Sequence, residues 1–398
     1  MRASALRMSE GKRWPDGNIV DTLGFASFEG ARLRRYLTTP CAVLLAAAFA
    51  TAAIGAATGD ETAARRANAE EPVGYGSSTR GGDPEDRVVV TSNAATGPGT
   101  LHALATDPAN SGKTIAFSTG HVITLTRHIE PRELAHVTID GLSSPDSTPV
   151  IRGPGIVKNP LFEIKGSRGC HDWVIRGLRF KDGGDDGFIR FEEGFRNGLV
   201  TRCSFHGSAD EQLSVAADPT ACDSITVQAC LLRQRHGSGG MLFWGGGHVT
   251  VAGCLFDTNE RYPRVRQRSV AQVVNNVFFN WRAHGSRVSA EGSGDWIANV
   301  WLPTARSDIG DAVVIDDDAG PVYLARNLEL GRSRADRATT RKPVTALDGL
   351  PVRDAHEALH HVLDHAGAPL LTEDPASRDA DDRRVLDAAR ARARALGS

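Results

Sequence analysis

Apolar residues recur along the chain in short segments that alternate in the manner of β-strands, and these segments repeat at a nearly constant interval. Each segment starts at an apolar anchor and carries a small or apolar residue three positions later. The six anchors are Ile175, Val200, Val227, Val251, Val274 and Ile297. Subtraction of neighbouring numbers gives spacings of 25, 27, 24, 23 and 23 residues. A repeat of this length with one short strand per turn predicts an all-β, single-stranded parallel β-helix, a solenoid in which each coil buries the apolar face of the next.

Cysteine and asparagine recur within these segments. Cys203, Cys230 and Cys254 occupy the same place in three successive segments. They predict an inward ladder of small, polarizable core residues, although stacked strands about 4.8 Å apart would also permit a disulfide between neighbours. For the asparagines of the last two segments, Asn275, Asn276 and Asn299, we expect a structural ladder rather than a functional site.

The flanks of the repeat have other patterns. Residues 97–104 predict a short helix that caps the open end of the solenoid, since exposed strand edges need such protection. The strand period fades after about residue 303, and two helical patterns over 356–365 and 379–396 are expected to pack on the outside. We therefore divide this part of the chain into a β-helix domain over 87–330 and a C-terminal extension over 331–398.

The N-terminal 57 residues have the pattern of a targeting leader. Basic residues at Arg32, Arg34 and Arg35 precede an apolar run over 41–57 that ends in small residues. The run is short for a membrane span, which needs about 20 residues, so we expect secretion without a membrane segment in the mature form, with an uncleaved anchor as the alternative. Residues 58–86 are polar and small, and predict a linker without fixed structure.

The distribution of charged residues is informative in one local segment rather than over the whole chain. The 398 residues have a formal net charge of −2, which gives no overall attraction to nucleic acid. Against this background Arg261, Arg264, Arg266 and Arg268 fall within eight residues, directly before the asparagine-bearing strand VVNNVFFNW. A basic cluster on a rigid strand edge predicts a site for a polyanion.

Acidic residues gather after two neighbouring segments. Asp185 and Asp186 follow one segment, and Asp210 and Glu211 follow the next; 210 − 186 gives 24, the length of one coil. These side chains are expected to lie on one face, where their oxygens would suit a hard cation such as Ca²⁺. The alternative is a solvated turn, because Gly and Asp are common in turns for backbone reasons.

Several of these motifs resemble pectate lyases of polysaccharide lyase family 1. The motif R-x-P-R-x-R starting at Arg261, followed by V-x-N-N, is the most specific. The segments GTLHAL from Gly99, HDWVIRGLRF from His171 and CSFHGSADEQLSV from Cys203 are similar to coils of a bacterial secreted subgroup. The resemblance covers roughly residues 88–390.

The resemblance implies a right-handed β-helix that cleaves pectate by β-elimination to 4,5-unsaturated products. It places Arg261 as the base that takes the C5 proton, with Arg264 and Arg266 binding substrate carboxylates. It implies calcium held by Asp186 and Asp210, with Asp185 and Glu211 beside them. The expected partner is an acidic polysaccharide, and the expected state is a monomer.

The chain departs from the family pattern at three places. Thr201-Arg202 stands where Asp-His is common, and Ser214 stands where many members have a second calcium carboxylate. The usual substrate-binding lysine is replaced by the stretch that starts at His236, which we take as a candidate substrate-binding residue.

Two other functions stay open on the sequence. A polygalacturonase-type glycoside hydrolase would use paired carboxylates as acid and base, but the chain lacks the N-T-D, G-H-G and R-I-K motifs of such enzymes. A non-catalytic glycan-binding β-helix would explain the lost carboxylate and lysine.

Overall fold

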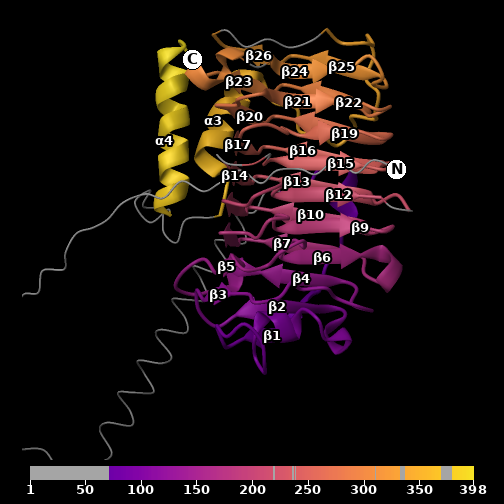
Figure 1. Cartoon of the computed structure of the whole chain (residues 1–398), viewed down its shortest axis with the longest axis vertical. Helices are drawn as coiled ribbons and strands as arrows, with labels where there is room; N and C mark the ends of the chain where they lie inside the picture. The colour runs from indigo at the N-terminus through magenta and orange to yellow at the C-terminus, as the bar shows by residue number, and fades with distance from the viewer. Residues whose placement is uncertain are drawn as a thin grey trace, which may run out of the picture. The chain divides into compact units, whose positions relative to one another are not determined.

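Parallel strands stacked coil upon coil form three long sheets that wrap around one apolar core (Figure 1). This computed structural model describes residues 71–217, 220–234, 237, 239–309, 311–331, 337–368 and 379–398. The expected leader over 1–57 lies outside these residues. The architecture is the predicted right-handed parallel β-helix.

Most strands of one sheet are about one coil apart in sequence. The ten-stranded sheet consists of β1 (Asp83–Val90), β2 (Lys113–Phe117), β4 (Val137–Asp140), β7 (Trp173–Arg176), β10 (Arg196–Thr201), β13 (Asp223–Gln228), β16 (Gly247–Ala252), β19 (Ser269–Val274), β22 (Ser293–Ile297) and β25 (Val322–Ala325). The nine-stranded sheet consists of β3 (Val122–Thr124), β5 (Val150–Arg152), β8 (Arg179–Lys181), β11 (Ser204–His206), β14 (Leu231–Arg233), β17 (Leu255–Asp257), β20 (Val277–Phe279), β23 (Val300–Leu302) and β26 (Leu328–Glu329). The seven-stranded sheet consists of β6 (Phe162–Lys165), β9 (Ile189–Glu192), β12 (Leu213–Ala216), β15 (Met241–Trp244), β18 (Arg264–Val265), β21 (His284–Val288) and β24 (Asp311–Ile315).

A full coil therefore contributes three strands, where the repeat predicted one. Each repeated segment spans a corner: its anchor lies in the ten-stranded sheet, and its last residues begin the nine-stranded sheet. The prediction also missed one shift in register. Val251 pairs with Val273 rather than Val274, so that coil advances by 22 residues. Valine occupies both positions, which is why the anchor pattern alone could not distinguish them.

The predicted cysteine ladder continues as an asparagine ladder at the same corner. The five described cysteines are free and buried, and burial raises the pKa of the Cys222 thiol to about 12. The Cys254 amide donates to Asn276 Oδ1 at 2.9 Å, and the Asn276 amide donates to Asn299 Oδ1 at 3.0 Å. Asn327 extends the series by one coil. The ladder therefore satisfies buried backbone groups, as we expected of Asn276 and Asn299. It lies at a different corner from the seven-stranded sheet, so it is not part of the arginine site.

Helices cover the flanks. They are η1 (Gly74–Ser78), α2 (Leu101–Leu104), η2 (Pro108–Asn110), η3 (Gly141–Ser143), η4 (Gly166–Arg168), η5 (Ala305–Ile309), α3 (Ala355–His365) and α4 (Ala380–Ala395). The two predicted C-terminal helices pack on the outer face of the nine-stranded sheet through a second apolar cluster (Figure 1). The buried carboxylate of Asp382 joins α4 to β11, at 2.6 Å from His206 Nε2 and 2.8 Å from Ser204 Oγ. Among the described residues no helix is long and apolar enough to span a membrane.

One boundary differs from the expectation. Residues 71–86, placed in a linker by their polar composition, form η1 and the start of β1. Gly76 is buried, and its amide donates to Thr226 Oγ1 at 2.9 Å. Polar side chains of the ten-stranded sheet thus order a segment that has little apolar surface of its own.

Candidate functional site

Arg261 lies in the loop that leads from β17 into β18, and buried contacts fix its backbone. The hydroxyl of the neighbouring Tyr262 donates to Phe279 O at 2.9 Å and accepts from Thr258 N at 2.8 Å. Arg261 has a left-handed φ of 68°, a conformation that costs a non-glycine residue about 1–3 kcal/mol. Gly240 allows the close approach of the coil below, because a Cβ there would lie 2.1 Å from Arg261 O.

The Arg261 guanidinium contacts carboxylates of an earlier coil and one carboxylate of its own loop. Its Nη1 lies 3.0 Å from Asp210 Oδ1 and also contacts the Glu211 carboxylate, and its Nε lies 3.6 Å from Glu260 Oε1. Burial lowers the pKa of Arg261, and Arg264 and Arg266 lower it further against the opposing effect of Asp210. The Arg261 side chain is only 14% exposed, so the neighbouring charged side chains, rather than water, determine the electrostatic environment of its guanidinium.

The acidic residues expected to hold a cation come together in part. Carboxylate oxygens of Asp186, Asp210 and Glu211 lie within 4.8 Å of one another. Asp186 directly precedes β9, and Asp210 and Glu211 precede β12, the next strand of the seven-stranded sheet. Asp185 has a different partner: its Oδ1 accepts a hydrogen bond from the Lys158 amide at 2.6 Å. It is not part of this carboxylate cluster.

Arg190, which the sequence did not single out, contacts the same cluster. Its Nη2 lies 2.6 Å from Asp186 Oδ1, and its Nε donates to Ser214 Oγ at 3.3 Å. Arg190 and Ser214 are register partners on β9 and β12. The Arg190 guanidinium therefore lies between the carboxylate cluster and Ser214, the position at which the family pattern has a further carboxylate.

Two other arginines of the R-x-P-R-x-R motif, Arg264 and Arg266, have N–H groups without a hydrogen-bond partner. The Nε atoms of Arg264 and Arg266 are buried without a hydrogen-bond partner, and neither side chain has an ion pair with a described residue. Burial, with Arg287 and Arg266 close by, lowers the pKa of Arg264. Arg268 differs, since its side chain is 78% exposed and lies 3.9 Å from Glu291. Arg264 and Arg266 thus offer half-buried positive charge with a buried N–H on each that has no acceptor, although Glu260 and Asp316 partly offset the charge of Arg264.

A histidine that the sequence analysis missed lies beside Arg261. His284 opens β21 and has its Nδ1 3.7 Å from Glu260 Oε2. Burial lowers the pKa of His284 to about 4, and Arg287, Arg264 and Arg261 act in the same direction. The one available signal was spacing, because 284 − 261 gives 23, the length of a coil. His236, the histidine predicted instead, lies outside the described residues.

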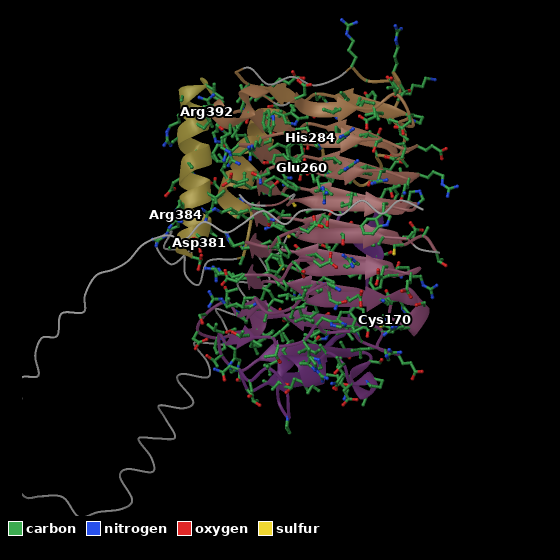
Figure 2. The ribbon with its side chains drawn as sticks, in the orientation of Figure 1. Cys170, Glu260, His284, Asp381, Arg384 and Arg392 are labelled. Atoms are coloured by element: carbon green, nitrogen blue, oxygen red, sulfur yellow. The ribbon has the colours of Figure 1, made fainter. Side chains whose placement is uncertain are left out.

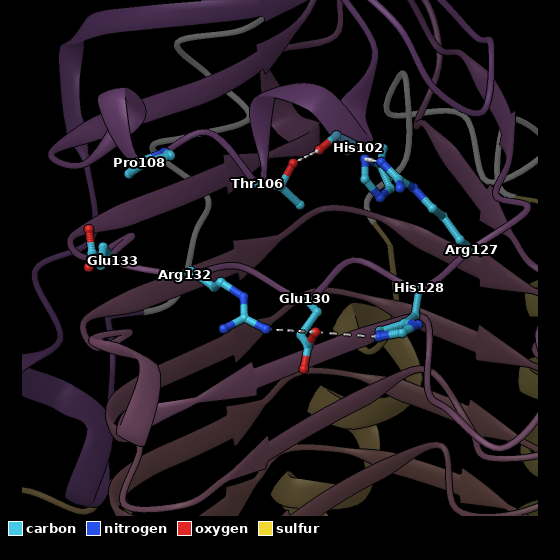
Figure 3. A pocket seen from close by; sticks show the side chains of 8 residues that line it. All are labelled: His102, Thr106, Pro108, Arg127, His128, Glu130, Arg132 and Glu133. Atoms are coloured by element: carbon cyan, nitrogen blue, oxygen red, sulfur yellow. Dashed lines mark hydrogen bonds and ion pairs between the residues drawn. The ribbon is translucent and has the colours of Figure 1, made fainter.

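A separate cavity of about 590 Å³ lies at the N-terminal end of the solenoid (Figure 3). Glu130 lies across its floor between Arg132 and His128, at 3.9 Å from a side-chain nitrogen of each. The nearby Glu163 has its pKa raised to about 7 by burial and by Glu192. Arg168 and Lys165 also contact Glu130, so this acidic group already has several cationic partners.

No protein-family model matches the sequence. Curated relatives include a probable pectate lyase C of Emericella nidulans, 27% identical over 58% of this chain, and one of Aspergillus terreus, 28% identical over 57%. The chain spans about half the length of these relatives, 51% of each.

Solved structures show the same fold. The major allergen of cedar pollen has a TM-score of 0.60 at 18% identity, over 75% of this chain and 93% of its own. A pectate lyase of a Bacillus species in complex with trigalacturonate has a TM-score of 0.54 at 15% identity, over 75% of this chain and 98% of its own. The resemblance read from the sequence motifs is confirmed: the sequence is similar to those of probable pectate lyases, and the fold is that of a solved pectate lyase.

Proposed function

We propose that this chain is a secreted polysaccharide lyase that cleaves pectate or a related uronate polymer by β-elimination, acting as a monomer. The observation that carries the proposal is the pair of half-buried arginines, Arg264 and Arg266, whose Nε–H groups have no acceptor and which lie close to Arg261, the partner of the Asp210 carboxylate. A buried N–H without an acceptor is costly, and a carboxylate-bearing ligand would supply the acceptor and neutralise the arginine charge. A relative that was solved with trigalacturonate supports a polyuronate as that ligand.

The arginines have two tasks in such a reaction. Arg264 and Arg266 bind uronate carboxylates through charge-assisted hydrogen bonds, which fixes the sugar on the outer face of the seven-stranded sheet. Arginine charge beside the carboxylate of the reacting sugar also stabilises the negative charge that develops when the C5 proton leaves. Arg261, ion-paired with Asp210 and Glu211, holds the two coils of the site together and is the family's candidate base.

The carboxylate cluster fits a hard cation in its chemistry. Asp186, Asp210 and Glu211 supply oxygen donors within 4.8 Å of one another, the ligand type that Ca²⁺ prefers. When bound, the ion would supply positive charge that acidifies C5 of a coordinated uronate. Arg190 and Arg261 pair with the same oxygens, so we expect calcium to bind weakly and only together with substrate.

The test is the absorbance of the 4,5-unsaturated product formed from polygalacturonate, with calcium and then with chelator. We expect calcium-dependent product, and Arg266→Ala should raise KM at least about tenfold because a buried charged contact is worth about 1.5–3 kcal/mol. Arg268→Ala is the matched control, since that side chain is largely exposed. New reducing ends without the absorbance would indicate a hydrolase. Binding of the polymer without either product would indicate a glycan-binding solenoid.

A further inference from the structure

Two histidines and one aspartate come together where strands of the ten-stranded sheet begin. His136 directly precedes β4, and His171 and Asp172 directly precede β7. β4 and β7 pair in parallel, and the amide of His136 donates to His171 O at 3.0 Å. The two imidazole rings pack edge to face with their centroids 4.9 Å apart. The three residues are therefore neighbours on two stacked coils.

This cluster lies apart from the arginines and carboxylates of the candidate active site. Figure 2 labels Cys170, which directly precedes His171, on a much earlier coil than Glu260 and His284. The Cys170 thiol belongs to the core, since it is buried and its Sγ donates to a backbone carbonyl at 3.5 Å. The side chains of His136 and His171 are 43% and 30% exposed, so an ion can reach them from solvent.

The nitrogen and oxygen atoms of the cluster have the spacing of metal ligands. His171 Nδ1 lies 2.9 Å from Asp172 Oδ2, and His136 Nδ1 lies 4.0 Å from Asp172 Oδ1. One ligand atom from each of the three residues lies within 4.8 Å of the other two. Two atoms bound tetrahedrally to Zn²⁺ at about 2.0–2.1 Å are roughly 3.3 Å apart. Small rotations of the side chains would therefore bring all three atoms onto one ion.

Asp172 is a buried carboxylate without a permanent cationic partner. Its side chain is 8% exposed, and among the described residues its ion-pair partners are only His136 and His171. An imidazole carries charge only when it is protonated, and a buried charge is normally either paired or bound to a metal. The Asn197 side chain and the Arg80 amide donate to the two oxygens of Asp172 at 2.9 and 3.3 Å. Such outer contacts orient a metal-binding carboxylate.

We propose that His136, His171 and Asp172 bind a divalent transition metal ion of the Zn²⁺ class, with water completing its coordination. Two imidazoles and one carboxylate suit such an ion, whereas Ca²⁺ prefers oxygen ligands alone. Binding displaces the proton that His171 Nδ1 shares with Asp172, and that proton passes to solvent. The proposal is independent of the lyase function, because it concerns other residues and no substrate.

The ion would fasten the early coils of the solenoid. It joins the coil of β4 to the coil of β7, and the Arg80 amide on Asp172 connects the segment before β1 to the same point. The unfolded chain does not hold these three side chains together, so an ion that binds them stabilises the folded state. Zinc at about 100 times its Kd should therefore raise the Tm by several degrees.

The experiment is calorimetric titration of the metal-free full chain with ZnCl₂. We expect the double variant His136→Asn, His171→Gln to bind zinc at least about 100-fold more weakly than wild type, since even loss of an outer contact costs about 10–100-fold. The matched control is the double variant His361→Gln, His365→Gln. Those rings stack at 4.4 Å on the outer helix α3 and could bind zinc themselves. The control should keep the tight site.

Two further measurements keep the proposal testable. Co²⁺ should give the strong visible absorbance of a tetrahedral ion in wild type but not in the double variant at the cluster, and zinc should raise the Tm of wild type alone. The single variant His136→Asn, at the more exposed ligand, should weaken zinc binding at least about tenfold if the double variant does not fold. Equal zinc affinity with and without the two ligands, loss of the site in the α3 control, or no binding by wild type would overturn the proposal.

Discussion

At the scale of single residues, the competition between Arg190 and a cation for Asp186 can be measured directly. Arg190 Nη2 lies 2.6 Å from Asp186 Oδ1, and like charges close together repel. Arg190→Gln removes one positive charge and frees the carboxylate, so we expect calcium to bind at least several-fold more tightly. Titration calorimetry with CaCl₂ measures this without reference to activity. Arg384→Gln, on the exposed face of α4, should leave the titration unchanged, and equal affinity in both variants would mean that Arg190 does not oppose the ion.

The residues of this site differed in how far they could be predicted. Asp186 and Asp210 could be paired from the sequence, because one coil separates them and both lie in polar turns. Arg190 and His284 could not, since each is a single polar residue on a strand and only the side chains around it give it a role. Asp185 shows the converse: its neighbour Asp186 joins the cluster, whereas Asp185 bonds to the Lys158 amide. Sequence spacing gives the coil, but not which of two adjacent side chains points into the site.

At the scale of elements, the asparagine ladder should contribute more to stability than the cysteine ladder that precedes it. Asn276 Oδ1 accepts from Cys254 N at 2.9 Å, and its Nδ2 donates to Val251 O at 2.9 Å. Asn276→Ala leaves both backbone groups buried without a partner, which should cost about 2–4 kcal/mol of the free energy of unfolding. Cys230→Ala removes only a weak donor and should cost about 1 kcal/mol. Urea unfolding of both variants tests this, and equal losses would contradict it.

The sequence predicted the strands at the repeated anchors correctly, but it did not predict that each coil contains three strands. Period-two alternation identified the strands around each anchor, because their inward side chains are apolar. The seven-stranded sheet left a weaker signal, since its outer face carries charged residues such as Arg190 and Arg264, and its strands are as short as the two residues of β18. The sheet that carries the candidate site is therefore the one whose strands the apolar pattern failed to find.

At the scale of the whole molecule, acidic pH should loosen the C-terminal helix from the solenoid. Lys181 Nζ on β8 lies 3.0 Å from Asp379 and 3.1 Å from Asp381 at the start of α4. Burial alone would raise the pKa of both carboxyls, but the Lys181 ammonium holds each below its ordinary value of 3.8. A lowered pKa in the folded state adds stability that is fully present above pH 3.8 and is lost as the pH falls through the folded values.

We therefore expect amide hydrogen exchange in α4, corrected for the intrinsic rate, to be slow at pH 5 and faster at pH 3. Glu130 and Asp172 on the early coils also have lowered pKa values, so acid weakens more than this one contact. Lys181→Met distinguishes the contributions, because it removes the cation that lowers both pKa values at α4 and leaves the early coils unchanged. In that variant α4 should already exchange faster at pH 5 and should accelerate less between pH 5 and pH 3. The same acceleration with and without Lys181 would mean that the apolar face and Asp382, rather than these ion pairs, determine how α4 responds to acid.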